Sequence, residues 1–310
     1  MTDVLPSWTD GPTRDAITAF VEAVSSGPDA LPEADRIAVF DNDGTLWTEK
    51  PMPTQLHYLL QQWAAAAKAD PSLADRQPYL AASTGDFGWL GSAVDKHYAG
   101  DDSDLGVMIA AISAATDGVS VDDYERAVAT FYSEAEHLTL KKPYSFAIYQ
   151  PMIELLRYLE AHAFTVYIVS GGDRDFMRPM TVDYYGIPPE RVIGTAFGLT
   201  YDEESNEVRY GASLDYFDDG PLKPVRIWTR TGKRPILAAG NSNGDLEMLR
   251  FTLKSPKHLG LLVHHDDDTG RGDAPYDKGT ERALEVAADP ANGITVVSVK
   301  SDWAQVFPEG

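Results

Sequence analysis

Apolar and polar residues follow one another along this chain in blocks that predict a layered α/β protein. Short apolar runs of strand length recur, and several are separated by stretches with apolar residues at helical spacing. This order is typical of a parallel sheet covered by helices on both faces. The predicted strands cover residues 36–40, 164–169, 191–197, 235–239, 258–264 and 293–299.

A long insertion separates the first two predicted strands. Residues 51–149 contain no convincing strand pattern. Apolar residues recur there instead at the spacing of amphipathic helices, over residues 55–68, 104–116 and 121–138. We therefore expect residues 51–149 to fold as an inserted α-helical cap domain.

The remaining segments complete the predicted fold. Pro151 stands in the first turn of a helix expected over residues 152–162, a position that proline prefers. Residues 199–220 alternate apolar side chains with acidic turns and predict a hairpin. Together these patterns predict an α/β protein with a three-layer, Rossmann-like core and a mostly parallel sheet, formed by residues 1–50 and 150–310.

Composition narrows the classes of partner. The net charge of −22 and the pI near 4.5 argue against nucleic acid and anionic membrane surfaces, because the summed field repels polyanions. The absence of cysteine excludes disulfides, thiol nucleophiles and thiolate metal sites. The N-terminal residues lack the basic and apolar blocks of a secretory signal, and no apolar run is long enough to span a membrane. We therefore expect a cytoplasmic protein, and composition predicts no particular oligomeric state.

The first predicted strand ends in the sequence AVFDNDGTLW, residues 38–47. Asp41 and Asp43 are two positions apart, so their side chains point the same way at a strand end, which suits cation binding or covalent chemistry. An Asp-Gly pair after an apolar run is also an ordinary turn. A calcium loop does not fit, because Thr45 and Leu46 stand where such a loop needs Asp or Asn and then Gly.

Polar residues also follow the other strands. Ser170, Gly171 and Gly172 end the second strand, and Lys223 begins a helix ahead of the fourth. Asn241 and Asp245 follow the fourth strand within the sequence GNSNGD. Because the carboxyl ends of parallel strands meet at one edge of the sheet, we expect these side chains to lie together.

This order of motifs resembles the haloacid dehalogenase-like superfamily of aspartate-nucleophile phosphotransferases. The resemblance extends from about residue 37 to at least residue 263, and the helical insertion stands where phosphoserine-phosphatase-like members carry their cap. It implies that Asp41 is the nucleophile that forms an aspartyl-phosphate and that Asp43 is the general acid and base. An aspartate at position 43 also indicates phosphoester hydrolysis rather than dehalogenation.

The resemblance further assigns the groups that handle the phosphate. Ser170, with the main chain of Gly171 and Gly172, is expected to grip the phosphate oxygens, although a plain turn is the alternative. Lys223 is expected to neutralise charge on the phosphate. Lys233 is the rival lysine, but it precedes a strand and so falls at the opposite end of the sheet.

The implied cofactor is Mg²⁺, held by the Asp41 carboxylate, the Asp43 main-chain carbonyl and the motif GNSNGD that follows the fourth predicted strand. That motif usually reads Gly-Asp-x-x-x-Asp, whereas this chain has Asn241 followed by Asp245. An amide oxygen binds Mg²⁺ without adding charge. We therefore expect either weaker metal binding or a greater share carried by Asp245.

The substrate side is less specific. Glu49 lies near the position of a glutamate that meets the substrate ammonium in phosphoserine phosphatases, and a solvated Glu49 beside Lys50 is the alternative. Arg174 could bind a substrate carboxylate or pair with Asp173 or Asp175. The run HHDDD, residues 264–268, resembles a metal cluster, but adjacent residues rarely converge on one ion, and we expect a solvated loop bordering the site.

These features predict a Mg²⁺-dependent phosphatase for a small phosphomonoester, such as phosphoserine or a similar metabolite. A phosphotransferase and a broad-specificity phosphatase are alternative enzymes. An alternative outside the enzymes is a protein that binds a phosphate ligand without turnover. Asn241, which replaces the usual aspartate, is the only residue that favours this alternative. Intact Asp41, Asp43 and Lys223 argue against it.

Overall fold

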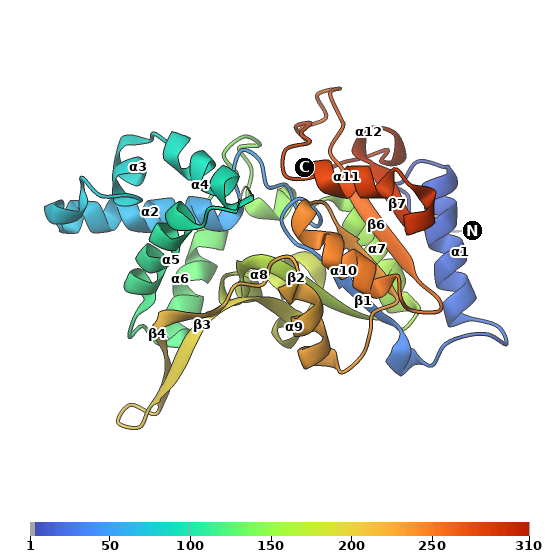
Figure 1. Cartoon of the computed structure of the whole chain (residues 1–310), viewed down its shortest axis with the longest axis horizontal. Coiled ribbons are helices and arrows are strands. Elements are labelled where there is room, and N and C mark those ends of the chain that lie inside the picture. Colours follow the sequence, from blue (N-terminus) through green and yellow to red (C-terminus); the bar gives the residue numbers. More distant parts are fainter. Residues whose placement is uncertain (1–3, 99, 310) are drawn as a thin grey trace. The chain divides into compact units, whose positions relative to one another are not determined.

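A computed structural model of the chain describes residues 4–98 and 100–309 and confirms the α/β fold (Figure 1). The strands are β1 (Ile37–Phe40), β2 (Thr165–Asp173), β3 (Val192–Asp202), β4 (Glu207–Tyr216), β5 (Leu237–Gly240), β6 (Leu259–His264) and β7 (Ile294–Ser298). The helices are α1 (Pro12–Ser25), α2 (Thr54–Ala69), α3 (Tyr79–Thr84), α4 (Gly88–Tyr98), α5 (Ser103–Thr116), α6 (Val121–Glu134), α7 (Gln150–Ala161), α8 (Arg174–Tyr185), α9 (Leu222–Thr231), α10 (Leu246–Thr252), α11 (Glu281–Ala287) and α12 (Val299–Asp302). Each predicted strand is present.

The seven strands form one sheet in the order β4-β3-β2-β1-β5-β6-β7. Neighbouring strands from β3 to β7 in this order pair in parallel, and β4 pairs antiparallel with the second half of β3. The chain builds outward in one direction from β1 to β3 and in the other from β5 to β7. The topological switch point therefore lies between β1 and β5, where sheets of this kind place their ligands.

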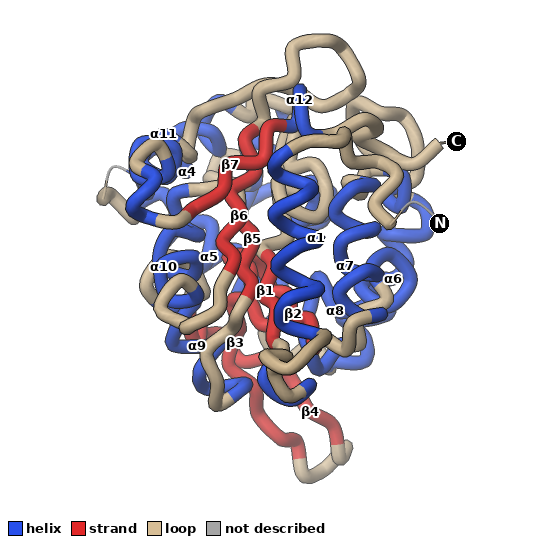
Figure 2. Tube along the Cα trace, turned by 90° about the vertical axis from the view of Figure 1, so that its right-hand side faces the viewer, coloured by secondary structure: helices blue, strands red, loops and turns tan. Residues whose placement is uncertain are grey.

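Helices cover both faces of the parallel strands, as Figure 2 shows, with α1, α7 and α8 on one face and α9, α10 and α11 on the other. Strand β1 is buried along its whole length. Alternate strand residues such as Val39 and Leu262 share a core cluster with Ile227 of α9 and Leu249 of α10. Burial on both faces explains why these strands are continuous apolar runs in the sequence.

The chain divides into two compact units. The first contains Met1–Pro51, Tyr132–Thr195 and Phe217–Gly310, and the second contains Met52–Phe131 and Ala196–Tyr216. The bounds of these units differ from those of the predicted core and cap, since Pro51 and residues 132–149 lie in the first unit and residues 196–216, which hold most of the predicted hairpin, lie in the second. The division into a catalytic core and a cap that acts on substrate stays a prediction.

Contacts within the second unit explain why the hairpin belongs to it. The Tyr210 backbone exchanges hydrogen bonds with Gly118 and Val119, its N–H to the Val119 carbonyl at 2.9 Å and its carbonyl from the Gly118 N–H at 2.8 Å. Its ring also packs edge-on against Tyr124, with centroids 5.2 Å apart. These contacts attach β4 to the end of α5 and to α6.

The helices of the second unit agree with the predicted ones and add two more. Predicted helices over residues 55–68, 104–116 and 121–138 correspond to α2, α5 and α6. The added helices are α3 and α4, and two glycines in α4 lower its intrinsic helix propensity. Within the described residues, no helix is both long and apolar enough to cross a membrane.

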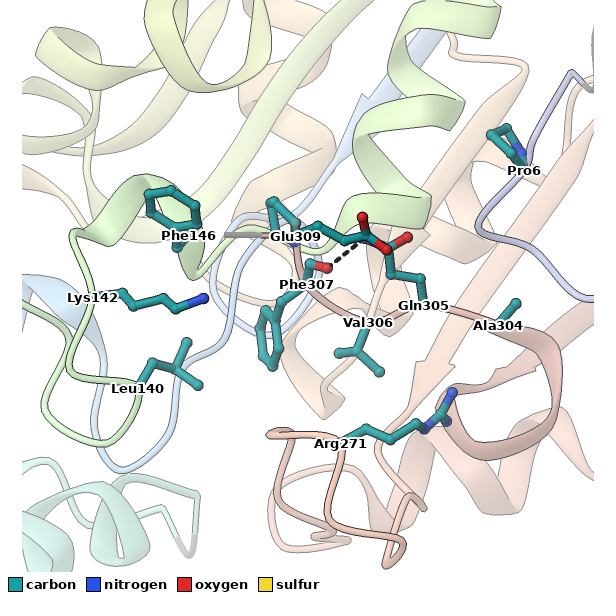
Figure 3. A pocket seen from close by; sticks show the side chains of 11 residues that line it. Pro6, Leu140, Lys142, Phe146, Arg271, Ala304, Gln305, Val306, Phe307 and Glu309 are labelled. Carbon is teal, nitrogen blue, oxygen red and sulfur yellow. Dashed lines mark hydrogen bonds between the residues drawn. The ribbon is translucent and has the colours of Figure 1, made fainter.

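A cavity of about 710 Å³ lies in the first unit, away from the predicted site residues (Figure 3). Its apolar walls include Leu140, Phe146, Val306 and Phe307, and Lys142 projects into it. None of the side chains that the sequence predicts for the site lines this cavity.

Candidate active site

Asp41 and Lys223 meet at the switch point of the sheet. Asp41 follows β1 directly, and its N–H bonds to the Ala239 carbonyl of β5 at 2.9 Å. Lys223, in the first turn of α9, donates from Nζ to Asp41 Oδ1 at 2.7 Å and to Asp245 Oδ1 at 2.6 Å. All three side chains are buried, and Lys223 is only 2% exposed. The structure thus places Lys223, rather than Lys233, beside the predicted nucleophile.

Lys233 lies at the other end of the sheet. Its Nζ donates to Asp35 Oδ1 at 2.6 Å, just before β1 begins. The carboxyl ends of β1 and β5 lie a full strand length away, so the rival lysine does not contribute to this cluster.

Burial sets the electrostatics of the Asp41 and Lys223 pair. Burial raises the pKa of Asp41 well above its ordinary value, the Asp245 carboxylate raises it further, and Lys223 opposes the shift. Burial alone would lower the pKa of Lys223, but Asp245 and Asp41 raise it above its usual value. Lys223 is therefore a fixed buried cation between two carboxylates.

Asp43 has a different environment from Asp41. It is partly exposed, and its Oδ1 accepts a hydrogen bond from Trp47 Nε1 at 2.7 Å. Burial raises the pKa of Asp43 to about 6, and the negative charge of Glu49 contributes in the same direction. An acid with a pKa in this range suits proton transfer in both directions near neutral pH.

Asp245 organises the loop that follows β5. Its Oδ2 accepts hydrogen bonds from the N–H groups of Asn241 and Ser242 and from Ser242 Oγ, at 2.9–3.0 Å. Its Oδ1 accepts from Lys223, and the side chain is fully buried. Both Asp245 oxygens are therefore engaged by donors of the protein.

Asn241 connects this loop to the loop after β1. Its Oδ1 accepts a hydrogen bond from Thr45 Oγ1 at 3.1 Å, and its Nδ2 donates to the Tyr276 hydroxyl at 3.2 Å. Gly44 packs directly against it, since a Cβ added at Gly44 would lie 2.1 Å from Asn241 Nδ2. The backbone of Gly44 has a φ of +75°, which glycine adopts without strain.

The Ser170 segment lies at the end of β2. Ser170 is buried, and its Oγ accepts a hydrogen bond from the Gly172 N–H at 3.0 Å. The Gly171 carbonyl accepts from Thr195 Oγ1 at 2.7 Å. The register between β2 and β3 shifts after Ser170, so the two glycines form an irregular strand end at the same edge of the sheet as Asp41.

The two predicted substrate contacts have protein partners. Arg174 binds Asp175 through two hydrogen bonds of 2.9 and 2.8 Å, which is the pairing that the sequence left open. Glu49 is partly exposed and lies 3.4 Å from Lys50 Nζ. The Lys50 ammonium also sits over the Tyr276 ring, 3.8 Å from its centroid.

The loop after β6 corrects one prediction. The run at residues 264–268 was expected to be a solvated loop, yet His265 is only 2% exposed and Asp267 is fully buried. His265 Nε2 lies 2.7 Å from the Gly44 carbonyl, and Nδ1 lies 2.6 Å from Asp273 Oδ2. The position of His265 at the carboxyl end of a parallel strand was the signal in the sequence that pointed to the site.

The oxygen atoms at this edge fit a hard divalent cation. Within the described residues, neither Asp41 Oδ2 nor the Asp43 carbonyl accepts a hydrogen bond, and Asn241 Oδ1 accepts only one. No group of three or more His, Cys, Asp or Glu side chains is arranged to hold a metal in the described part of the chain. Mg²⁺ suits such a set, because it needs few carboxylates and keeps several waters.

Comparisons with known proteins identify a matching family and a shared fold. The family description "haloacid dehalogenase-like hydrolase" matches residues 38–250, whereas no curated protein matches the sequence. A protein with unknown function from Bordetella pertussis Tohama I superposes with a TM-score of 0.54 at 13% identity, covering 84% of this chain and 97% of that chain.

Two further solved structures are less similar in shape. A functionally unknown protein from Anaerococcus prevotii DSM 20548 has a TM-score of 0.47 at 18% identity, covering 82% of this chain and 85% of that chain. A phosphoserine phosphohydrolase-like protein from Francisella tularensis subsp. tularensis SCHU S4 has a TM-score of 0.39 at 15% identity, covering 76% of this chain and 90% of that chain. At these identities, the Bordetella structure supports a shared fold and nothing finer.

Proposed function

Because the chain belongs to the haloacid dehalogenase-like hydrolases, we propose that it hydrolyses a small phosphomonoester through an aspartyl-phosphate on Asp41. One observation carries the proposal. The buried Asp41 carboxylate is held at Oδ1 by Lys223, while Oδ2 accepts no hydrogen bond from the described residues, so one oxygen is oriented and the other is available to attack.

In the first step, Asp41 Oδ2 forms a bond to phosphorus as the ester P–O bond breaks. The electron pair of that bond goes to the leaving alcohol oxygen, which takes a proton from Asp43. A pKa of about 6 keeps a useful fraction of Asp43 protonated near neutral pH. The products of this step are the free alcohol and the acyl-phosphate.

In the second step, a water molecule attacks phosphorus and gives a proton to the Asp43 carboxylate. The bond between Asp41 and phosphorus breaks, which restores the Asp41 carboxylate and releases inorganic phosphate. Asp43 acts as acid and then as base, and its return to the protonated form completes the cycle. Lys223 stays bound to Asp41 Oδ1 and offsets negative charge throughout.

The phosphate would be held by the end of β2. Ser170 Oγ accepts from Gly172 and keeps its own hydroxyl proton to donate to a phosphate oxygen. Gly171 and Gly172 permit close approach of the main chain. A small metabolite with an amino group, such as phosphoserine, would place that group near Glu49, which is close enough to Asp43 to raise its pKa.

Hydrolases of this family typically depend on Mg²⁺, and the oxygen set described above suits it. We assign the Asp41 carboxylate, the Asp43 carbonyl and Asn241 Oδ1 as its protein ligands, because both Asp245 oxygens are engaged by other donors. When bound, Mg²⁺ would neutralise phosphate charge next to these acids. Titration of Mg²⁺ into wild type and Asn241→Asp tests the assignment, since equal affinities would remove Asn241 from the set.

Release of phosphate from p-nitrophenyl phosphate tests the proposed reaction. We expect turnover by the wild type with Mg²⁺ and none by Asp41→Asn, with Asp35→Asn as a matched exposed control that retains activity. A panel of about a hundred phosphorylated metabolites would then identify the substrate, because specificity is a difference in transition-state binding. Absence of turnover across that panel, with p-nitrophenyl phosphate also intact, would instead support a binding protein.

A further inference from the structure

We propose that His265 is a positioning residue that, with Asp273 and Tyr276, fixes the loop after β1 and the Asn241 amide for catalysis. The inference deepens the proposed function and rests on it. It makes the loop after β6 an additional part of the site, beside the strand ends that the family motifs occupy.

The loop from His265 to Tyr276 is closed at its base. The Tyr276 N–H donates to the His265 carbonyl at 2.9 Å, and the two rings stack with centroids 4.6 Å apart and planes at 10°. This closure places two side chains from opposite ends of the loop side by side. They face the loop after β1 together.

Both nitrogens of the His265 ring face oxygen atoms. The Gly44 carbonyl can only accept a hydrogen bond, so Nε2 carries the proton on that side, at 2.7 Å. On the other side, Nδ1 lies 2.6 Å from Asp273 Oδ2, within hydrogen-bond distance. The second Asp273 oxygen accepts from the Tyr149 hydroxyl at 3.0 Å. The ring is therefore held in one orientation by buried partners.

Asp273 is itself held by Tyr149, which packs against a residue that lines the cavity of the first unit. Tyr149 stacks on Phe307, with centroids 5.6 Å apart, and Phe307 lines the cavity shown in Figure 3. Tyr149 is fully buried, as is its contact with Asp273. A chain of buried contacts therefore runs from Phe307 through Tyr149 and Asp273 to His265, which holds the Gly44 carbonyl. Gly44 lies between Asp43 and Thr45 in the chain.

The bond to the Gly44 carbonyl lies one peptide plane from the Asp43 carbonyl, a predicted metal ligand. The Gly44 N–H donates to the Trp47 carbonyl at 2.8 Å and its carbonyl accepts from His265, so both peptide planes beside Gly44 are fixed. The Asp43 carbonyl belongs to the first of these planes. Tyr276 in turn accepts from Asn241 Nδ2, which orients the Asn241 oxygen. Outer partners of metal ligands commonly change affinity or activity by about 10- to 100-fold.

A metal-ligand role for His265 does not fit the geometry. A histidine that binds a metal needs one ring nitrogen directed at the ion, whereas both His265 nitrogens lie within hydrogen-bond distance of protein oxygens. If His265 served packing alone, kcat and Mg²⁺ affinity would not depend on which of its two hydrogen bonds a substitution keeps. That difference can be tested.

Substitution of His265 by glutamine or by asparagine distinguishes the contributions of its two hydrogen bonds. Glutamine places its Nε2 near the histidine Nε2 and keeps the donor to Gly44, whereas asparagine reaches only the Asp273 side. We expect His265→Asn to lower kcat for p-nitrophenyl phosphate and to weaken Mg²⁺ binding by calorimetry, each about 10- to 100-fold, with KM unchanged. His265→Gln should recover most of both losses.

The neighbouring His264 provides the matched control, because its Nε2 contacts the exposed Asp277 and not the site. His264→Asn should leave kcat and Mg²⁺ affinity as in the wild type. Equal losses in His265→Gln and His265→Asn, or losses that follow the thermal midpoint of each variant, would overturn the positioning role.

Tyr276→Phe keeps the stacked ring and removes the hydroxyl that contacts Asn241 and Glu49, so it tests the proposal even where His265 variants do not fold. We expect weaker Mg²⁺ binding with an unchanged thermal midpoint, and wild-type affinity in Tyr276→Phe would overturn the proposal. A wild type that binds Mg²⁺ without turnover would contradict the proposed hydrolysis instead, and the calorimetric comparison of the His265 variants would still decide their role.

Discussion

The buried carboxylates of this protein differ in how their charge is compensated. Asp245 accepts four hydrogen bonds, including one from Lys223, and Asp41 accepts one from the same lysine. Asp218 is fully buried, and neither of its side-chain oxygens accepts a hydrogen bond from the described residues. The cost of an uncompensated buried carboxylate is largest when it is ionised.

Asp218 therefore makes stability depend on pH. Burial raises its pKa from the ordinary 3.8 of an aspartate to about 7. The folded protein binds a proton there that the unfolded chain has released between these values, so stability falls as pH rises through this window, by about 4 kcal/mol in total. We expect Asp218→Asn to match wild type near pH 4 and to be more stable at pH 8, measured by urea unfolding.

The exposed Asp215 is the control for this change, and Asp215→Asn should shift the free energy of unfolding by less than about 0.5 kcal/mol at either pH. A stability difference between Asp218→Asn and wild type that stays constant from pH 4 to pH 8 would show that Asp218 does not titrate in this range.

Sequence spacing located some of these residues and missed others. Asp41, Lys223 and Asn241 could be placed together because strand ends of a parallel sheet meet at one edge. The engagement of Arg174 by Asp175, and the burial of His265, depend on side-chain packing that periodicity does not report. Adjacent acidic residues after His265 suggested solvation, although Asp267 is buried with Arg271 as its partner.

At the scale of elements, the turn after β1 is the tightest part of the site. Gly44 has φ +75° and would bring a Cβ to 2.1 Å from Asn241 Nδ2 and 2.9 Å from the Tyr276 hydroxyl. We expect Gly44→Ala to abolish phosphatase activity and to lower the free energy of unfolding by about 2 kcal/mol or more.

Gly27 separates backbone strain from close packing. It has a φ of +79°, and an added Cβ would meet no atom within 4 Å. Gly27→Ala should cost only about 1 kcal/mol from its backbone and keep full activity. Full activity in Gly44→Ala would show that the loop tolerates displacement of Asn241.

The elements themselves were largely predictable. Continuous apolar runs identified the parallel strands because these are buried on both faces, and Pro151 marked the first turn of α7. Helix α4 was not predicted, since its two glycines give little helical signal. The hairpin was predicted, but its attachment through Tyr210 to Val119 depends on contacts between segments far apart in the sequence.

At the scale of the whole molecule, the net charge of −22 has a direct consequence. Its field repels polyanions, so we expect no retention on immobilised heparin and no shift of duplex DNA at about 50 mM salt. Binding that weakens with added salt would reveal a basic surface that the composition hides. The same field concentrates Mg²⁺ around the protein.

Reductive trapping can detect the proposed covalent intermediate on Asp41. Borohydride added during turnover of p-nitrophenyl phosphate with Mg²⁺ should reduce an acyl-phosphate and leave homoserine at position 41, identified by peptide mass spectrometry. We expect this product only when substrate is present, with Asp43 unchanged. Continued phosphate release with an intact Asp41 in every trapped sample would rule out an aspartyl-phosphate at this position.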